Sequence, residues 1–171
     1  PRIVLSKMWN ACWKVATGEI YGHMGDDIVF RSQGWDTVVR NLFAEYPDRI
    51  VFGYGKDGNG ESERNKFGTH GFIHKNWTKT VGYFVPPYYV SDYNDTHLND
   101  LAKAVGRHRY IDIYTEHMHF SLGKSEKDRN TEERLARHER EHPEQIYNSQ
   151  EKRIERENDA EKLRVFIDEH N

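Results

Sequence analysis

The sequence of 171 residues contains one cysteine, five prolines and no long apolar run. The lone Cys12 excludes an internal disulfide and is typical of a reducing compartment. No segment approaches the roughly 18 consecutive apolar residues of a membrane-spanning helix, and no signal peptide opens the chain. We therefore expect a cytoplasmic protein that makes no membrane contact.

The sequence also lacks an excess of positive charge, since its formal net charge is -3. This excludes a general attractive field for nucleic acid, so binding to a polyanion would need a local patch. Hydrophobic residues make up 36% of the chain and aromatic residues 13%, which suffices for a core and excludes a disordered chain. The length fits one domain of the usual size.

Charge is unevenly spread, because residues 124–171 hold 11 Lys and Arg against 14 Asp and Glu, whereas residues 1–123 hold 14 of each sign. Interleaved charges on strong helix formers predict a helix from about Asn130, broken by Pro143, and a second over 150–169. The second helix carries only a thin apolar stripe: Ile154, Leu163, Phe166 and Ile167. We interpret 124–171 as a charged helical extension that docks on the body or on a partner and offers a surface for oligomerisation.

The body alternates between helical and strand patterns. Apolar residues at helical spacing predict helices over 5–16, 35–46 and 95–105. Short apolar runs predict strands over 20–24, 49–54 and 110–114, with short apolar elements at 71–74 and 81–84. The polar, glycine-rich run 55–65 predicts a long loop able to close over a ligand. Together these patterns indicate an α/β sheet, in which ligands bind at the carboxyl ends of strands.

Two polar clusters follow predicted strands. Asp26 and Asp27 follow the strand over 20–24, and His117 and His119 follow the strand over 110–114. Carboxylates and imidazole together suit a divalent ion, Mn²⁺ or Mg²⁺, with open positions left for phosphate oxygens. His117 and His119 point the same way on a strand, so either could be the ligand. The alternative interpretation is a solvated turn with surface or packing histidines.

A cluster of aromatic residues predicts a binding platform. Its members are Trp77, Tyr83, Phe84, Tyr88, Tyr89 and Tyr93. Aromatic faces pack against sugar rings and stack on bases, so the cluster could bind a sugar or a base. Core packing is the alternative for each aromatic ring.

Three segments resemble the central part of GT-A-fold nucleotide-sugar glycosyltransferases of the family-two type: Lys7-Met8-Trp9-Asn10-Ala11, Ala16-Thr17-Gly18-Glu19-Ile20 and Gly25-Asp26-Asp27. In that family a helix with a polar Lys/Arg-x-x-Asn leads into the strand that ends at an acidic DxD-type motif. The later order is similar too: Gly34-Trp35-Asp36, Gly71-Phe72-Ile73-His74, Gly82-Tyr83-Phe84, an acidic helix start and a late histidine. The resemblance covers about residues 3–123 and is strongest to phage and bacterial members.

The resemblance implies a GT-A-like, Rossmann-like mixed sheet flanked by helices, over 1–123, with the charged extension 124–171 behind it. It implies an inverting transfer of a sugar from a nucleotide-diphosphate donor, such as a UDP-sugar, to a hydroxyl of a glycan, a protein or modified DNA. A phage-encoded enzyme would work in the host cytoplasm.

The resemblance also assigns roles to individual residues. It places Asp27 and His119 on the metal ion. It places three residues on the donor: Lys7, Asn10 and Asp26. It places three on the acceptor side: Trp77, Tyr83 and His117. Asp95 matches the acidic residue that serves as base at a helix start, and Asp92 is the reserve candidate. The alternative for Asp95 is a helix N-cap.

The sequence departs from the family in two ways. The acidic motif is Gly25-Asp26-Asp27 rather than a strict Asp-x-Asp. The family begins with a strand-helix-strand unit that holds the nucleotide base, and nothing precedes Pro1 to supply it, so we expect an N-terminally incomplete catalytic domain. Two other functions remain open: a metal-dependent phosphoesterase or nuclease, and a non-catalytic interaction domain on a degenerate scaffold.

Overall fold

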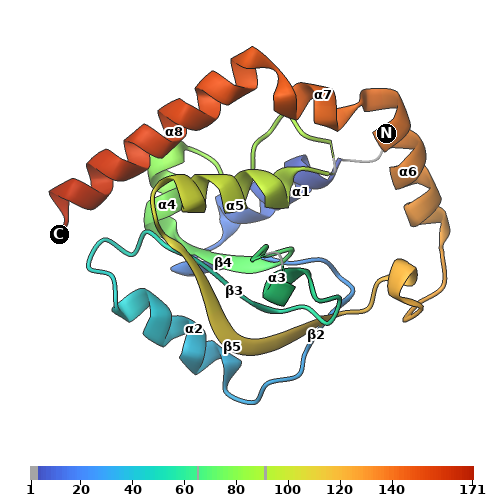
Figure 1. The fold of residues 1–171 in the computed structure, drawn as a ribbon, viewed down its shortest axis with the longest axis horizontal. Helices are drawn as coiled ribbons and strands as arrows, with labels where there is room; N and C mark the ends of the chain where they lie inside the picture. Colours follow the sequence, from blue (N-terminus) through green and yellow to red (C-terminus); the bar gives the residue numbers. More distant parts are fainter. Residues whose placement is uncertain (1–3, 65, 91) are drawn as a thin grey trace.

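Five strands form one mixed sheet in the computed structural model of the protein, which describes residues 4–64, 66–90 and 92–171. The strands are β1 (Ile20–His23), β2 (Ile28–Phe30), β3 (Phe52–Lys56), β4 (Gly71–His74) and β5 (His108–His117). They lie in the order β1-β4-β3-β5-β2, with β3 and β5 parallel and the other neighbours antiparallel (Figure 1). The predicted α/β class is confirmed as a mixed sheet flanked by helices.

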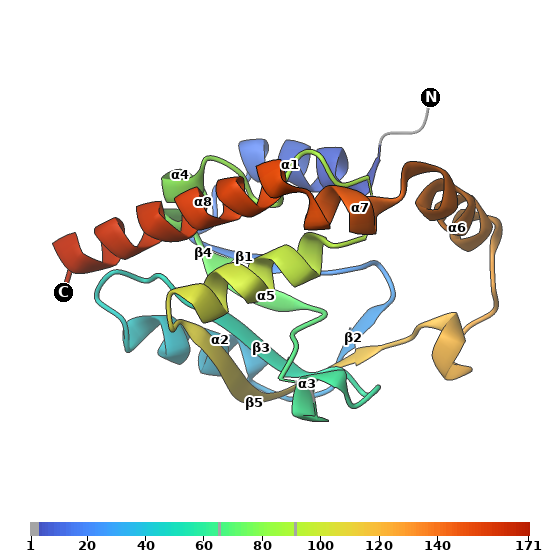
Figure 2. The same cartoon turned by 45° about the horizontal axis from the view of Figure 1, so that its top comes forward.

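Helices cover both faces of this sheet. They are α1 (Leu5–Val15), α2 (Trp35–Ala44), α3 (Glu61–Arg64), α4 (Lys75–Val81), α5 (Asn94–Ala104), the 3₁₀ helix η1 (Phe120–Leu122), α6 (Arg129–Glu141), α7 (Pro143–Asn148) and α8 (Gln150–Glu169). Helix α2 lies on one face, and α1, α4, α5 and α8 lie on the other (Figures 1 and 2). Across the described ranges, none of the helices is both long enough and apolar enough to cross a membrane.

Alternating residues of the central strands pack against the helices on opposite faces of the sheet. On β4, Phe72 packs beneath α2, whereas Ile73 packs in the larger cluster with α4, α5 and α8. On β3, Phe52 faces the larger cluster. Its neighbour Gly53 faces α2, where an added Cβ would lie 2.3 Å from a methyl carbon of Leu42. The glycine therefore lets α2 pack directly on the middle of the sheet.

Several element boundaries differ from the predicted ones. Strand β3 begins at Phe52 rather than at residue 49, and β5 is longer than 110–114 because its pairing continues onto β2. The run 55–65 is not all loop, since it contains α3. The apolar element at 81–84 is not a strand, because α4 ends at Val81 and Gly82 turns the chain with a φ of +90°.

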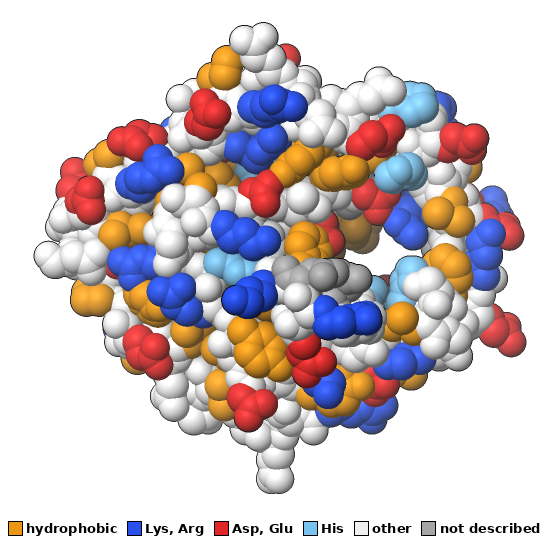
Figure 3. Space-filling model, viewed as in Figure 1, with side chains coloured by type: hydrophobic (Ala, Val, Ile, Leu, Met, Phe, Trp, Pro, Cys, Tyr) orange, Lys and Arg blue, Asp and Glu red, His pale blue; other side chains and the backbone are white. Residues whose placement is uncertain are grey.

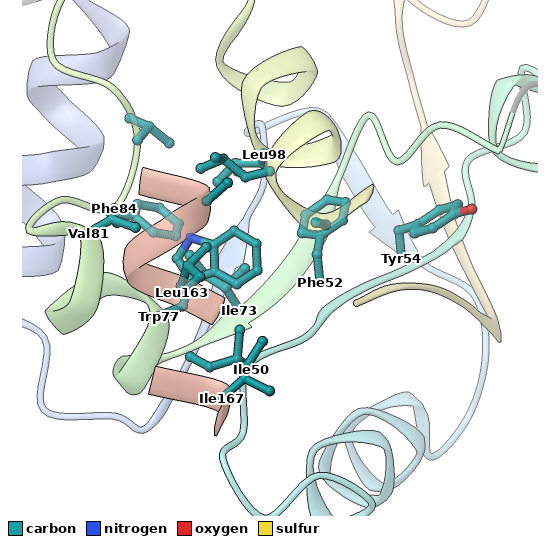
Figure 4. Packing of buried hydrophobic residues seen from close by; sticks show 14 residues of the cluster. Ile50, Phe52, Tyr54, Ile73, Trp77, Val81, Phe84, Leu98, Leu163 and Ile167 are labelled. Atoms are coloured by element: carbon teal, nitrogen blue, oxygen red, sulfur yellow. The ribbon is translucent and has the colours of Figure 1, made fainter. Parts of the chain in front are cut away.

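The end of the chain completes the main core. Ala160, Leu163 and Ile167 on α8 are buried against the residues of α4 and α5 (Figure 4). Asp159, also buried, accepts a hydrogen bond of 2.5 Å from the hydroxyl of Tyr83. The predicted break at Pro143 begins a short helix, α7, instead of a loop. The extension therefore contributes its last helix to the core of the body.

We predict that Leu163→Ala will lower the free energy of unfolding by about 2–5 kcal/mol, because the side chain is fully buried and its loss leaves a cavity. Val165→Ala on the same helix is the matched control, since Val165 is 48% exposed, and its effect should stay within about 0.5 kcal/mol. Urea unfolding followed by circular dichroism measures both changes. Equal effects of the two substitutions would mean that α8 does not depend on this core contact.

Candidate active site

The topology brings the two predicted polar clusters to one edge of the sheet. Strands β1, β3 and β5 all end at this edge, because β3 and β5 run parallel and β1 pairs antiparallel to β4 beside them. Ile28, the first residue of β2, lies opposite His117, the last residue of β5. The turn between β1 and β2, which carries Asp26 and Asp27, therefore meets the end of β5.

Asp27 and His117 contact each other at this edge. The Oδ2 atom of Asp27 lies 3.0 Å from Nε2 of His117, although the residues are 90 positions apart. The backbone fixes the pair, since Met118 N–H donates to the Asp27 carbonyl at 2.8 Å and His117 N–H donates to the Asp57 carbonyl at 2.9 Å. A Cβ at Gly25 would lie 2.5 Å from the Asp27 carboxylate, so the glycine leaves room for it.

His119 lies beside this pair, but its side chain caps the 3₁₀ helix η1. Strand β5 ends at His117, so His117 and His119 do not share a strand face as predicted. His119 caps η1, and its Nδ1 accepts from the backbone N–H of Ser121 at 3.3 Å and lies 2.7 Å from the Ser121 hydroxyl. The rings of His119 and His117 are 5.0 Å apart. Burial, followed by the charges of His117 and Arg134, lowers the pKa of His119.

Two buried histidines extend the site into the protein. The ring of His70 meets the ring of His117 edge-on at 4.7 Å, and His23 lies beyond it. Burial lowers the pKa of His23 to about 4 and that of His70 to about 3, so both rings are neutral at pH 7. Among the residues described, no partner within hydrogen-bond geometry reaches either ring. The Thr69 backbone opposes the lowering of the His23 pKa, and the His23 backbone opposes that of His70.

The loop after β3 is fixed by buried polar contacts that the sequence did not reveal. Asp57, which is almost fully buried, accepts from Asn59 N–H at 3.0 Å and from the Thr69 hydroxyl at 3.2 Å. Asn99 on α5 exchanges two hydrogen bonds with the Gly68 backbone, at 2.8 and 2.9 Å. These contacts hold the segment that carries His70 against the site.

The two predicted base candidates have different surroundings. Burial raises the pKa of Asp95 to about 6, and its carboxylate accepts from Thr96 N–H at 2.8 Å. Helix α5 begins at Asn94 with Tyr93 in the cap position, so Asp95 lies in the first turn and is not the N-cap. Asp92 instead pairs with α6, at 2.7 Å from Arg134 and 2.5 Å from His138.

Of the predicted donor-binding residues, Asn10 is engaged within the protein. Its amide donates to the carbonyls of Ser6 and Val85, at 2.9 and 2.8 Å, and its Oδ1 accepts from Phe84 N–H at 2.9 Å. The side chain thus joins α1 to the segment after α4, and its assignment to the donor stays a prediction. Lys7 and Asp26 are exposed, and their assignment to the donor stays a prediction.

Of the two aromatic residues assigned to the acceptor side, Trp77 lies in the core and Tyr83 is half-buried against it. Trp77 is fully buried on α4, so it offers no face to an acceptor. Tyr83 is held by Asp159 and by His97, whose Nε2 is 3.0 Å from the tyrosine oxygen. Aromatic residues of a core and of a binding site give the same sequence pattern. Only the burial of each side chain in the folded protein distinguishes them. His117 alone of the three assigned residues lies at the sheet edge.

The Asp27 and His117 side chains are 3.0 Å apart, which is a hydrogen-bond distance, and a carboxylate and an imidazole are both ligand types for divalent ions. The described part of the chain contains no group of three or more His, Cys, Asp or Glu side chains arranged to hold a metal. An ion here would keep positions for water and for ligand oxygens.

Comparisons with protein-family models, with curated proteins and with solved structures find no match to this chain. The function must therefore be argued from the site itself.

We predict that His117→Ala will weaken Mn²⁺ binding by about tenfold or more, because it removes the imidazole that touches Asp27. His119→Ala is the matched control, and we expect its Mn²⁺ affinity to stay within about twofold of the parent, since His119 is engaged with Ser121. Isothermal titration with MnCl₂ distinguishes the two. A larger loss in His119→Ala would return the ligand role to His119, as the sequence first suggested.

Proposed function

We propose that the protein is a glycosyltransferase that moves a sugar from a nucleotide-diphosphate donor to an acceptor hydroxyl, with a divalent ion, Mn²⁺ or Mg²⁺, at Asp27 and His117. The observation that carries the proposal is the contact between these two residues at the carboxyl ends of β1 and β5. This is the edge at which α/β sheets bind ligands. The order of motifs along the chain resembles GT-A-fold family-two enzymes and supports the same reading.

The metal would be held by the Asp27 carboxylate and the His117 imidazole. When bound, it would neutralise the negative charge of the diphosphate leaving group. His70 supports His117 edge-on and stays neutral, so it adds no positive charge that would repel the ion. Asp57 fixes the backbone of His117 from the loop after β3.

Asp95 is the proposed base that takes the proton from the acceptor hydroxyl. Burial raises the pKa of its carboxyl group to about 6, which makes it a better proton acceptor than an ordinary aspartate while leaving it mostly ionised at pH 7. Asp92 is not the proposed base, because its two oxygens are already engaged by Arg134 and His138.

Donor binding tests the proposal against the two other functions. With MnCl₂ present, the matching nucleotide-sugar from a panel of UDP-, GDP- and dTDP-sugars should raise the melting temperature by about 5–10 °C at a concentration near 100 times its dissociation constant. A non-catalytic interaction domain predicts no shift with any of them. A phosphoesterase predicts metal-dependent hydrolysis of a phosphodiester without sugar transfer.

We predict that Asp95→Asn will lower the transfer rate by roughly 10²–10⁴-fold while donor affinity is retained, because the amide cannot accept the proton. The parent enzyme should gain activity as the pH rises through about 6, since the raised pKa keeps the carboxyl group protonated below that value, and the variant should lose this step. Asp168→Asn, at an exposed position on α8, is the control. An unchanged rate in Asp95→Asn would assign proton removal to another group.

A further inference from the structure

Helices α5 and α8 lie side by side and enclose a groove of about 230 Å³ between them. Lys and Arg side chains gather over these two helices on the face seen in the space-filling view (Figure 3). Leu101 and Ala160, both buried, form the floor of the groove. None of the described lining residues belongs to the edge where Asp27 meets His117. Three arginines of α8 line the groove: Arg153, Arg156 and Arg164.

The helical repeat of α8 turns these arginines to one side. Positions 153, 156, 160 and 164 follow one another at intervals of three or four residues, so they share a face of the helix. The residue at position 160 is an alanine, whose short side chain leaves space between Arg156 and Arg164. The groove therefore stays open above its apolar floor.

Neutral groups fix Arg156 without cancelling its charge. The guanidinium donates to the Tyr147 carbonyl at 2.9 Å, and it lies over the Tyr147 ring, 3.9 Å from the ring centre. Neither contact supplies a negative charge. Within the described part of the chain Arg156 has no ion pair, and neither has Arg153, one helical turn earlier. Arg156 is thus a cation that is already positioned, and an anion can bind it without first breaking an ion pair.

The other charged residues of the groove leave these two arginines unpaired. Asp100 lines the groove from α5 and accepts a hydrogen bond from the Tyr147 hydroxyl. Glu157 is exposed. Arg164 pairs at 3.0 Å with Glu161, which does not line the groove. The groove therefore combines an apolar floor with two guanidinium groups that no carboxylate holds.

We propose that the groove between α5 and α8 binds a small organic phosphate, with its phosphate group on Arg153 and Arg156. Planar guanidinium groups bind phosphate oxygens in pairs, and a phosphate monoester carries more negative charge than a carboxylate. The organic part lies on the apolar lining residues Leu101, Ala104 and Ala160. This site goes beyond the proposed glycosyltransferase activity and does not depend on it.

Titration calorimetry of the full chain in phosphate-free buffer tests the proposal, with phenyl phosphate, inorganic phosphate and phenol as probes. The parent should bind phenyl phosphate with a dissociation constant below about 1 mM, bind inorganic phosphate more weakly and not bind phenol. Arg153→Ala should weaken the binding of phenyl phosphate about 10- to 100-fold. The fold should be retained, because Arg153 is exposed. Arg140→Ala on α6 is the matched control and should bind like the parent, since Arg140 is exposed and pairs with Glu141.

Glu157→Gln should produce the opposite change. It removes a negative charge from the groove and leaves the arginines in place, so phenyl phosphate should bind about 2- to 5-fold more tightly. Asp168→Asn removes the same charge at an exposed position of α8 outside the groove and should match the parent. Parent-like affinity in Arg153→Ala, or an equal loss in Arg140→Ala, overturns the inference. Equal affinity of the parent for the two phosphates overturns the organic ligand, and no measurable binding of either overturns the site.

Discussion

Strand β5 determines where the site lies, because it pairs with two different strands along its length. Its first part runs parallel to β3, and its last residues, Thr115 to His117, run antiparallel to β2. The parallel pairing brings the carboxyl ends of both strands to one edge. The pairing with β2 then brings back the turn that holds Asp26 and Asp27. The pairing with β2 alone places Asp27 against His117, and the pairing with β3 places this contact at the edge where β3 also ends.

Much of the fold follows from the sequence. The sequence patterns predict helices α1, α2 and α5, strand β1 and the final helix close to their observed positions. The role of α8 is harder to predict, because charges surround its few apolar residues. Ala160, Leu163 and Ile167 recur on one face and are buried, while Ile154 of the predicted stripe is 48% exposed. A thin apolar stripe indicates that a helix packs against something. The structure shows that α8 packs against α4 and α5.

The sequence predicted the candidate site in outline and missed its details for physical reasons. Both polar clusters were expected at one edge, and they meet there. The choice between His117 and His119 depends on where β5 ends, which pairing with Ile28 decides. Asn10 hydrogen-bonds a segment more than seventy positions away, and no local pattern reveals such a contact. The lowered pKa values of His23 and His70 result from burial, and the sequence around these two histidines does not predict that they are buried.

The segment between the sheet and α5 gives two nearby carboxylates opposite surroundings. Tyr93 lies between them with a φ of +72°, a left-handed conformation that costs a non-glycine residue on the order of 1–3 kcal/mol. On one side of it Asp92 faces the cations of α6, and on the other side Asp95 lies half-buried in the first turn of α5. One carboxylate thus holds two side chains of α6, whereas the pKa of the other is raised to about 6. A relaxed backbone at Tyr93 would change the directions of Asp92 and Asp95 together. The strained conformation therefore maintains the contacts of both carboxylates in the folded protein.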